Sequence, residues 1–129
     1  MTTDPKSPQA HDVPQTSQPV TTLHPGAGYI TIINRYAVAP ERAEELVDLL
    51  VRATVETMRY LPGFAAATVR MSVDRSQLVN YTQWRNRESI ESAGADPKVA
   101  ALLSEAAQIA DAFTPILYEM RQSVAASSA

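Results

Sequence analysis

Cysteine is absent from this chain of 129 residues, and histidine occurs only at His11 and His24. Without cysteine, the protein can form no disulfide, no thiolate metal site and no CxxC redox pair, and it has no cysteine nucleophile. Glycine is also scarce, and the four glycines are too scattered to form a phosphate-binding loop. The sequence therefore contains no recognisable cradle for a nucleotide cofactor.

Basic residues are few and dispersed. The chain has 11 Lys and Arg against 14 Asp and Glu, which gives a formal net charge of -3, and no basic run occurs. Nucleic acids and anionic membranes are bound by clustered basic surfaces, so neither is expected as a partner. The chain also lacks an export signal and any apolar stretch of about 18 residues. These features predict a cytoplasmic protein.

The first 27 residues differ from the rest in composition. Five of the nine prolines lie there, among Thr, Ser, Gln and Asp, and no apolar periodicity is present. Such a segment cannot bury enough surface to offset its chain entropy, so residues 1–27 are predicted to form a disordered or loosely docked arm. Both histidines fall in this arm. One folded domain is expected over residues 28–124, and residues 125–129 are expected to fray.

The domain is predicted to follow the order β-α-β-β-α-β. The segment from Tyr29 to Val38 is rich in β-branched and aromatic residues and indicates a strand, and Pro40 then begins a helix of about five turns that ends at residues 61–63. Two further strands are expected at 64–73 and 77–85, joined by a turn at 74–76. A short helix capped by Asn86 should run to about Ala93, and a helix capped by Asp96 should run from Pro97 to about Ala110. A last strand is expected at 113–121, where Pro115 indicates an edge position. This order predicts an α+β, ferredoxin-like split βαβ fold with both helices on one face of the sheet.

The other face of such a sheet would be bare. It would carry apolar residues such as Ile33, Val79 and Tyr81, or their neighbours on the opposite strand faces, and an uncovered apolar patch of that size is unusual on a monomer. We therefore expect a homodimer in which two sheets pack face to face.

Three side chains able to hydrogen-bond are expected on one side of the sheet. The first and third strands are central neighbours in this fold, so Asn34 can approach Asn80 and Trp84 if their faces agree. Two carboxamides and an indole provide uncharged donors and acceptors beside a large apolar plate, which suits an aromatic ligand with oxygen substituents. The alternative is a structural role, because strand asparagines are commonly paired within the protein and a single tryptophan is commonly core or interface.

Metal binding has little support in the sequence. Glu88 and Glu91 are three residues apart on the short helix, but the domain offers no His or Cys to join them, and they are interpreted as a solvated face. We expect neither a metal nor a cofactor.

With these residues in view, the chain resembles the antibiotic biosynthesis monooxygenase family over about residues 29–122. The resemblance rests on Asn34, on LPGF at 61–64, on VNYTQW at 79–84 and on GADP at 94–97. It is similar to the small cofactor-independent anthrone oxygenases of aromatic polyketide pathways, which form dimeric α+β barrels. The resemblance implies that Asn34, Asn80 and Trp84 are catalytic, and we expect Tyr36 and Thr82, on the same strand faces, to bind substrate.

The resemblance also implies a reaction. An anthrone methylene would be oxidised to a quinone carbonyl by O2, through a substrate enolate and a radical pair, without metal, flavin or nicotinamide. Some relatives use a Tyr and an Arg in a proton relay where this chain has Ile90 and Leu103. A non-catalytic polyketide-binding protein and a polyketide cyclase of the same fold are the alternatives.

Overall fold

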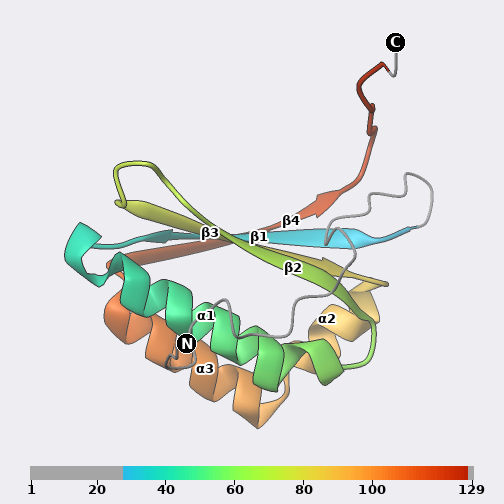
Figure 1. Ribbon diagram of the computed structural model, residues 1–129. Helices are drawn as coiled ribbons and strands as arrows, with labels where there is room; N and C mark the ends of the chain where they lie inside the picture. The colour runs from blue at the N-terminus through green and yellow to red at the C-terminus, as the bar shows by residue number, and fades with distance from the viewer. Residues whose placement is uncertain (1–27, 128–129) are drawn as a thin grey trace, which may run out of the picture.

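The computed structural model describes residues 28–127, which form a four-stranded antiparallel sheet with the helices beneath one face (Figure 1). The predicted arm at 1–27 and the last two residues of the predicted frayed end lie outside the described residues. The elements are β1 (Ile30–Ala37), η2 (Pro40–Arg42), α1 (Ala43–Glu56), η3 (Met58–Tyr60), β2 (Phe64–Met71), β3 (Gln77–Trp84), α2 (Arg87–Gly94), α3 (Pro97–Ile109) and β4 (Ala112–Glu119).

The sheet has the order β2-β3-β1-β4, with every neighbouring pair antiparallel. This arrangement confirms the predicted ferredoxin-like fold and the central pairing of the first and third strands. It also confirms the edge position predicted from Pro115, because β4 has a strand on one side only. Proline is tolerated there since an edge strand can lose an amide donor.

The first helical region differs from the prediction. A single helix of about five turns was expected, but the structure has 14 residues of α-helix between two short 3-10 segments. The backbone leaves helical geometry at Thr57, where φ is -132°. Leu46 and Leu50 are buried, whereas Val47, Val55 and Met58 are only partly buried. Shortening the helix leaves the last of these outside α1.

The two later helices begin at the predicted caps. The Oδ1 atom of Asn86 accepts a hydrogen bond from the backbone N–H of Ser89 at 2.8 Å, and Oδ1 of Asp96 accepts one from Lys98 N–H at 2.7 Å. Side-chain acceptors at these positions satisfy amides that have no partner in the first helical turn. The caps thus fix where α2 and α3 start relative to the sheet.

The main core lies between the sheet and α1. Its largest buried side chains include Tyr36 and Leu78 from the strands and Leu46 from the helix, and Ala106 of α3 joins the same cluster. α3 packs beside α1 and also touches α2 (Figure 1). This arrangement leaves β4 exposed along its whole length.

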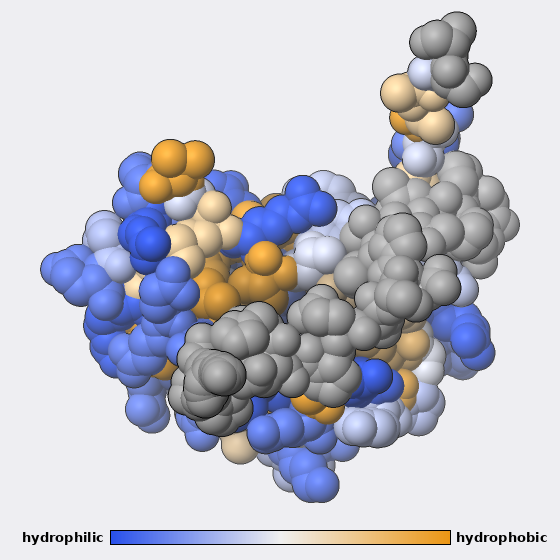
Figure 2. Space-filling model, viewed as in Figure 1, coloured by the Kyte–Doolittle hydropathy of each residue, from blue (hydrophilic) through white to orange (hydrophobic). Residues whose placement is uncertain are grey.

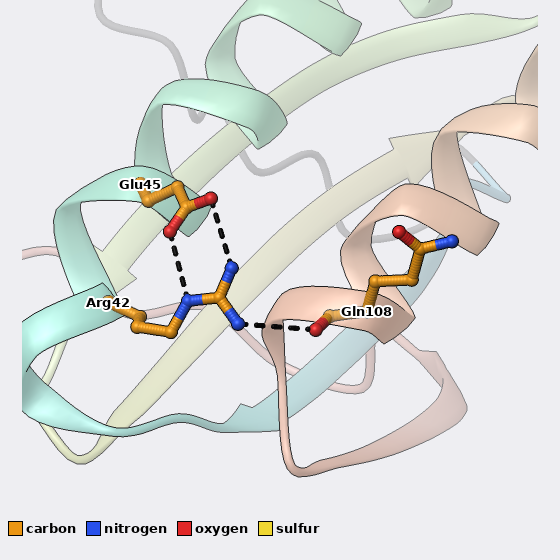
Figure 3. A network of polar contacts seen from close by, with 3 residues as sticks. All are labelled: Arg42, Glu45 and Gln108. Carbon is orange, nitrogen blue, oxygen red and sulfur yellow. Dashed lines mark hydrogen bonds and ion pairs between the residues drawn. The ribbon is translucent and has the colours of Figure 1, made fainter.

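A surface contact links the start of the first helical region to the end of α3 (Figure 3). The Arg42 guanidinium forms a two-pronged ion pair with Glu45, at 3.0 and 3.1 Å, and also donates to the carbonyl oxygen of Gln108 at 3.4 Å. The hydrogen bond from Arg42 holds the pKa of the Glu45 carboxyl below its usual value. Because both side chains are solvated, this contact positions the helices more than it stabilises them.

Among residues 28–127, none of the helices has the length and apolar character needed to cross a membrane. The cytoplasmic location stays a prediction.

Val73, in the turn between β2 and β3, is fully exposed, and Figure 2 shows hydrophobic surface at that end of the molecule.

Candidate functional site

Asn34 and Asn80 lie directly opposite each other on β1 and β3. Their side chains share the sheet face that carries Tyr36 and Leu78, and that face is directed toward the helices. Val69 on β2 and Pro115 on β4 complete the same row across the sheet. The predicted juxtaposition of the two carboxamides is confirmed, with Asn34 half-buried and Asn80 only 9% exposed.

Trp84 shares this face but lies further along β3, in the row of Ile30. Four residues of extended chain separate it from Asn80, a distance of about 13 Å along the strand. Its indole N–H donates to the Thr82 hydroxyl at 2.9 Å, and the ring meets Phe64 edge to face with centroids 5.4 Å apart. With exposures of 1% and 3%, Trp84 and Thr82 form a buried, mutually satisfied pair.

Tyr36 lies on the other side of the asparagine pair and is 2% exposed. Its ring stacks on Phe113 of β4, with centroids 4.9 Å apart and planes 25° apart. Burial without a charged partner raises the pKa of the Tyr36 phenol to about 12, because the ionised form loses its hydration. The phenol is therefore a neutral donor and acceptor at any physiological pH.

Two polar atoms on this face are buried without a hydrogen-bond partner in the described chain. They are the hydroxyl oxygen of Tyr36 and Oδ1 of Asn80. Buried polar groups in native proteins are nearly always paired with protein or water, so each exception needs an explanation. A ligand with its own polar atoms would supply one.

The edge strand contributes an apolar wall to the site, which was not predicted from the sequence. Phe113, Pro115 and Leu117 are in register with Tyr36, Asn34 and Ile32, so they share the helix-side face. Phe113 and Leu117 are nonetheless 40% and 41% exposed, because α3 packs on α1 and α2 rather than closing over β4. The alternation of these residues within the last predicted strand could have placed them on one face. It could not show that this part of the face is exposed, because that depends on where the helices lie over the sheet.

The remaining candidates lie outside this face. Ile90, on α2, is half-buried, and Leu103, on α3, is 43% exposed. Glu88 and Glu91 are both exposed on α2. Within the part of the chain that the structure describes, no three His, Cys, Asp or Glu side chains are grouped so that they could hold a metal ion.

The site therefore combines a carboxamide pair, a buried phenol and a flat apolar edge. Known proteins are similar to this chain in sequence and in fold. The chain is 40% identical over 80 residues to the tetracenomycin-F1 monooxygenase of Streptomyces glaucescens, a match that covers 62% of this chain and 71% of that protein.

Two solved structures have the same fold. One is the monooxygenase ActVA-Orf6 of Streptomyces coelicolor in complex with nanaomycin D, at 26% identity and a TM-score of 0.69, covering 78% of this chain and 93% of that one. The other is SnoaB of Streptomyces nogalater, a cofactor-independent oxygenase, at 20% identity and a TM-score of 0.63, covering 75% of this chain and 97% of that one. The family profile described as antibiotic biosynthesis monooxygenase matches residues 29–105. Because this match spans more than half of the sequence, the chain belongs to the antibiotic biosynthesis monooxygenase family.

Proposed function

We propose that this protein is a cofactor-independent oxygenase that converts the methylene of an anthrone-type aromatic polyketide into a quinone carbonyl. The observation that carries the proposal is the pair formed by Asn34 and Asn80, opposite each other at the boundary between the buried core and the open apolar edge at Pro115. The similarity to a monooxygenase named for tetracenomycin F1 supports an aromatic polyketide as the substrate class.

The reaction requires an electron-rich substrate, because triplet O2 reacts slowly with closed-shell molecules. The methylene carbon first loses a proton to solvent and becomes an enolate. The enolate gives one electron to O2, and the resulting radical and superoxide join through a new C–O bond. Protonation gives a hydroperoxide, which loses water as its O–O bond and the remaining C–H bond break. One oxygen atom ends in the carbonyl and the other in water.

In this scheme the protein stabilises the enolate oxygen. The carboxamide N–H groups of Asn34 and Asn80 are neutral donors held on rigid strands, and donors fixed in advance stabilise a developing oxyanion better than water does. The apolar edge of β4 would receive the rings. Trp84 would shape the far end of the pocket, with its orientation set by Thr82.

Oxygen consumption with anthrone, measured together with quinone formation, tests this function. We expect O2 uptake equal to quinone formed, above the uncatalysed rate, and unaffected by a chelator or by the absence of flavin and nicotinamide. Asn80→Ala and Trp84→Phe should each lower the rate in folded protein. Binding of anthrone without O2 uptake would favour an accessory binding protein, and ring closure without O2 uptake would favour a cyclase.

We also propose that two copies pair through the sheet face directed away from the helices. That face carries a sheet patch formed by five apolar side chains in adjacent register positions, of which the two on β4 are 41% and 44% exposed; the five are Ile33, Val79, Tyr81, Ile116 and Tyr118. Burying such a patch against a second copy would remove it from water.

Light scattering tests the pairing. Wild-type protein should have the mass of a dimer, whereas Ile116→Glu should shift it toward the monomer, since a charge on an exposed edge position disfavours apolar contact without disturbing the core. A monomeric wild type would refute the pairing.

A further inference from the structure

The hydroxyl of Tyr36 and Oδ1 of Asn80 have no hydrogen-bond partner in the described chain, and the donor role proposed for the asparagine N–H groups does not account for them. The Tyr36 hydroxyl can donate and accept a hydrogen bond, whereas Oδ1 of Asn80 can only accept. In a protein interior a polar group left without a hydrogen-bond partner is unfavourable, because it has lost its hydration and gained nothing in return. The fold therefore keeps one free donor and one free acceptor on the same face.

The two residues occupy neighbouring positions on one face of the sheet. Tyr36 is opposite Leu78, and Asn80 is the next residue of β3 on the same face, so the two are diagonal neighbours across β1 and β3. Diagonal pairs lie about 7–8 Å apart, within reach of a long aromatic side chain. Stacking on Phe113 also fixes the Tyr36 ring, so its hydroxyl is held in place before any ligand arrives.

We propose that Tyr36 and Asn80 together hold a phenolic hydroxyl of the substrate. The phenol oxygen of the ligand accepts from the Tyr36 O–H, and its hydrogen is donated to Asn80 Oδ1, so one ligand group satisfies both atoms. This inference rests on the proposed function and narrows it to hydroxylated anthrones. Tyr36 is then a specificity residue, and its phenol stays protonated as the role requires.

The proposed role and a purely structural role of Tyr36 predict opposite effects of Tyr36→Phe on thermal stability. If the hydroxyl served only the fold, its removal would lower stability. Because it has no partner, Tyr36→Phe removes a desolvated group and leaves almost no cavity. We expect the variant to melt at the same temperature as wild type or higher. The loss should appear only in recognition of the ligand hydroxyl.

Thr68 provides a matched control. Its Oγ1 is the third buried atom without a partner in the described chain, but Thr68 pairs with Tyr81 and so lies on the opposite face of the sheet. Thr68→Val also removes an unsatisfied hydroxyl from a strand. It should leave the preference between ligands unchanged.

The experiment compares emodin anthrone, which carries phenolic hydroxyls, with anthrone, which carries none. For wild type and the two variants, kcat/KM is measured after subtraction of the uncatalysed rate, and Kd is measured under anaerobic conditions by ligand fluorescence. Wild type should prefer emodin anthrone by about 10- to 100-fold. Tyr36→Phe should lose most of that preference, because its kcat/KM for emodin anthrone should fall much more than its kcat/KM for anthrone.

The outcomes separate the two proposals. If wild type binds both compounds but oxidises neither, the proposed oxygenase function fails, and the Kd ratio still tests the hydroxyl site. If Tyr36→Phe keeps the wild-type preference in both measurements, the hydroxyl site is refuted. Should that variant fold poorly, Asn80→Leu removes the acceptor instead and must reduce the same preference.

Discussion

The hydrogen bond between Trp84 and Thr82 gives the sharpest test of how the site is built. Both residues are almost fully buried, and the indole N–H has its one donor capacity used at 2.9 Å by the Thr82 hydroxyl. Thr82→Val replaces the hydroxyl by a methyl group of similar size. The substitution therefore leaves an indole N–H buried without an acceptor and creates no cavity.

The expected loss of stability follows from that unpaired donor. A buried hydrogen-bonding group left without a partner is unfavourable by about 1–3 kcal/mol, so Thr82→Val should lower the free energy of unfolding by about 2 kcal/mol. For a domain of this size each kcal/mol corresponds to about 4–8 °C, so Tm should fall by about 8–16 °C. Thr82→Ser keeps the acceptor and should lose no more than about 1 kcal/mol, the value of one methyl group.

A double-mutant cycle by thermal and urea unfolding isolates the interaction. In a Trp84→Phe background no N–H remains, so adding Thr82→Val should change the free energy of unfolding by less than about 0.5 kcal/mol. A Tm for Thr82→Val within about 2 °C of wild type would refute the reasoning. It would mean that the indole N–H finds another acceptor and is available to a ligand.

Three further outcomes follow from local geometry. Gly63→Ala should lower the free energy of unfolding in urea by about 2–4 kcal/mol, because φ is +82° and the added methyl group would overlap Ser89 of α2. Gly94→Ala adds a methyl group in open space and should be neutral or stabilising. Equal effects of the two substitutions would contradict this reasoning. Asn86→Ala should cost about 1 kcal/mol through the lost cap on α2, seen as a lower Tm, and Asn86→Asp should retain most of it. The amide and hydroxyl of Ser76 and the hydroxyl of Ser72 donate to Asp74 and hold the pKa of its carboxyl below the usual 3.8. The wild type should therefore be more stable than Asp74→Asn above pH 3.8, and this difference should disappear as the pH falls through the lowered pKa of the folded state. A difference in unfolding free energy that persists in acid would contradict this.

The sequence predicted the sheet well because its signals were local. Pro115 indicated the edge strand, Asn86 and Asp96 marked the helix starts, and the topology implied that Asn34 and Asn80 meet. The ends of α1 were harder to predict, because the 3-10 segments depend on how the chain turns back toward the sheet.

The site was predictable only as a set of residues sharing one face. Strand alternation placed Tyr36 and Trp84 there, but it could not show that Trp84 donates to Thr82 or that the Tyr36 hydroxyl lacks a partner. Those facts depend on rotamers and packing in three dimensions. The exposure of Phe113 likewise depends on where α3 settles, which no strand pattern reports.

The uncovered edge of β4 also bears on how the protein stays in solution. An open strand edge offers its backbone to any other extended chain, which is the usual route to strand-by-strand aggregation. Pro115 stands in the middle of β4 and has no amide hydrogen to offer, so a foreign strand cannot pair continuously along this edge. The same residue that borders Asn34 in the site thus prevents another strand from extending the sheet at its β4 edge.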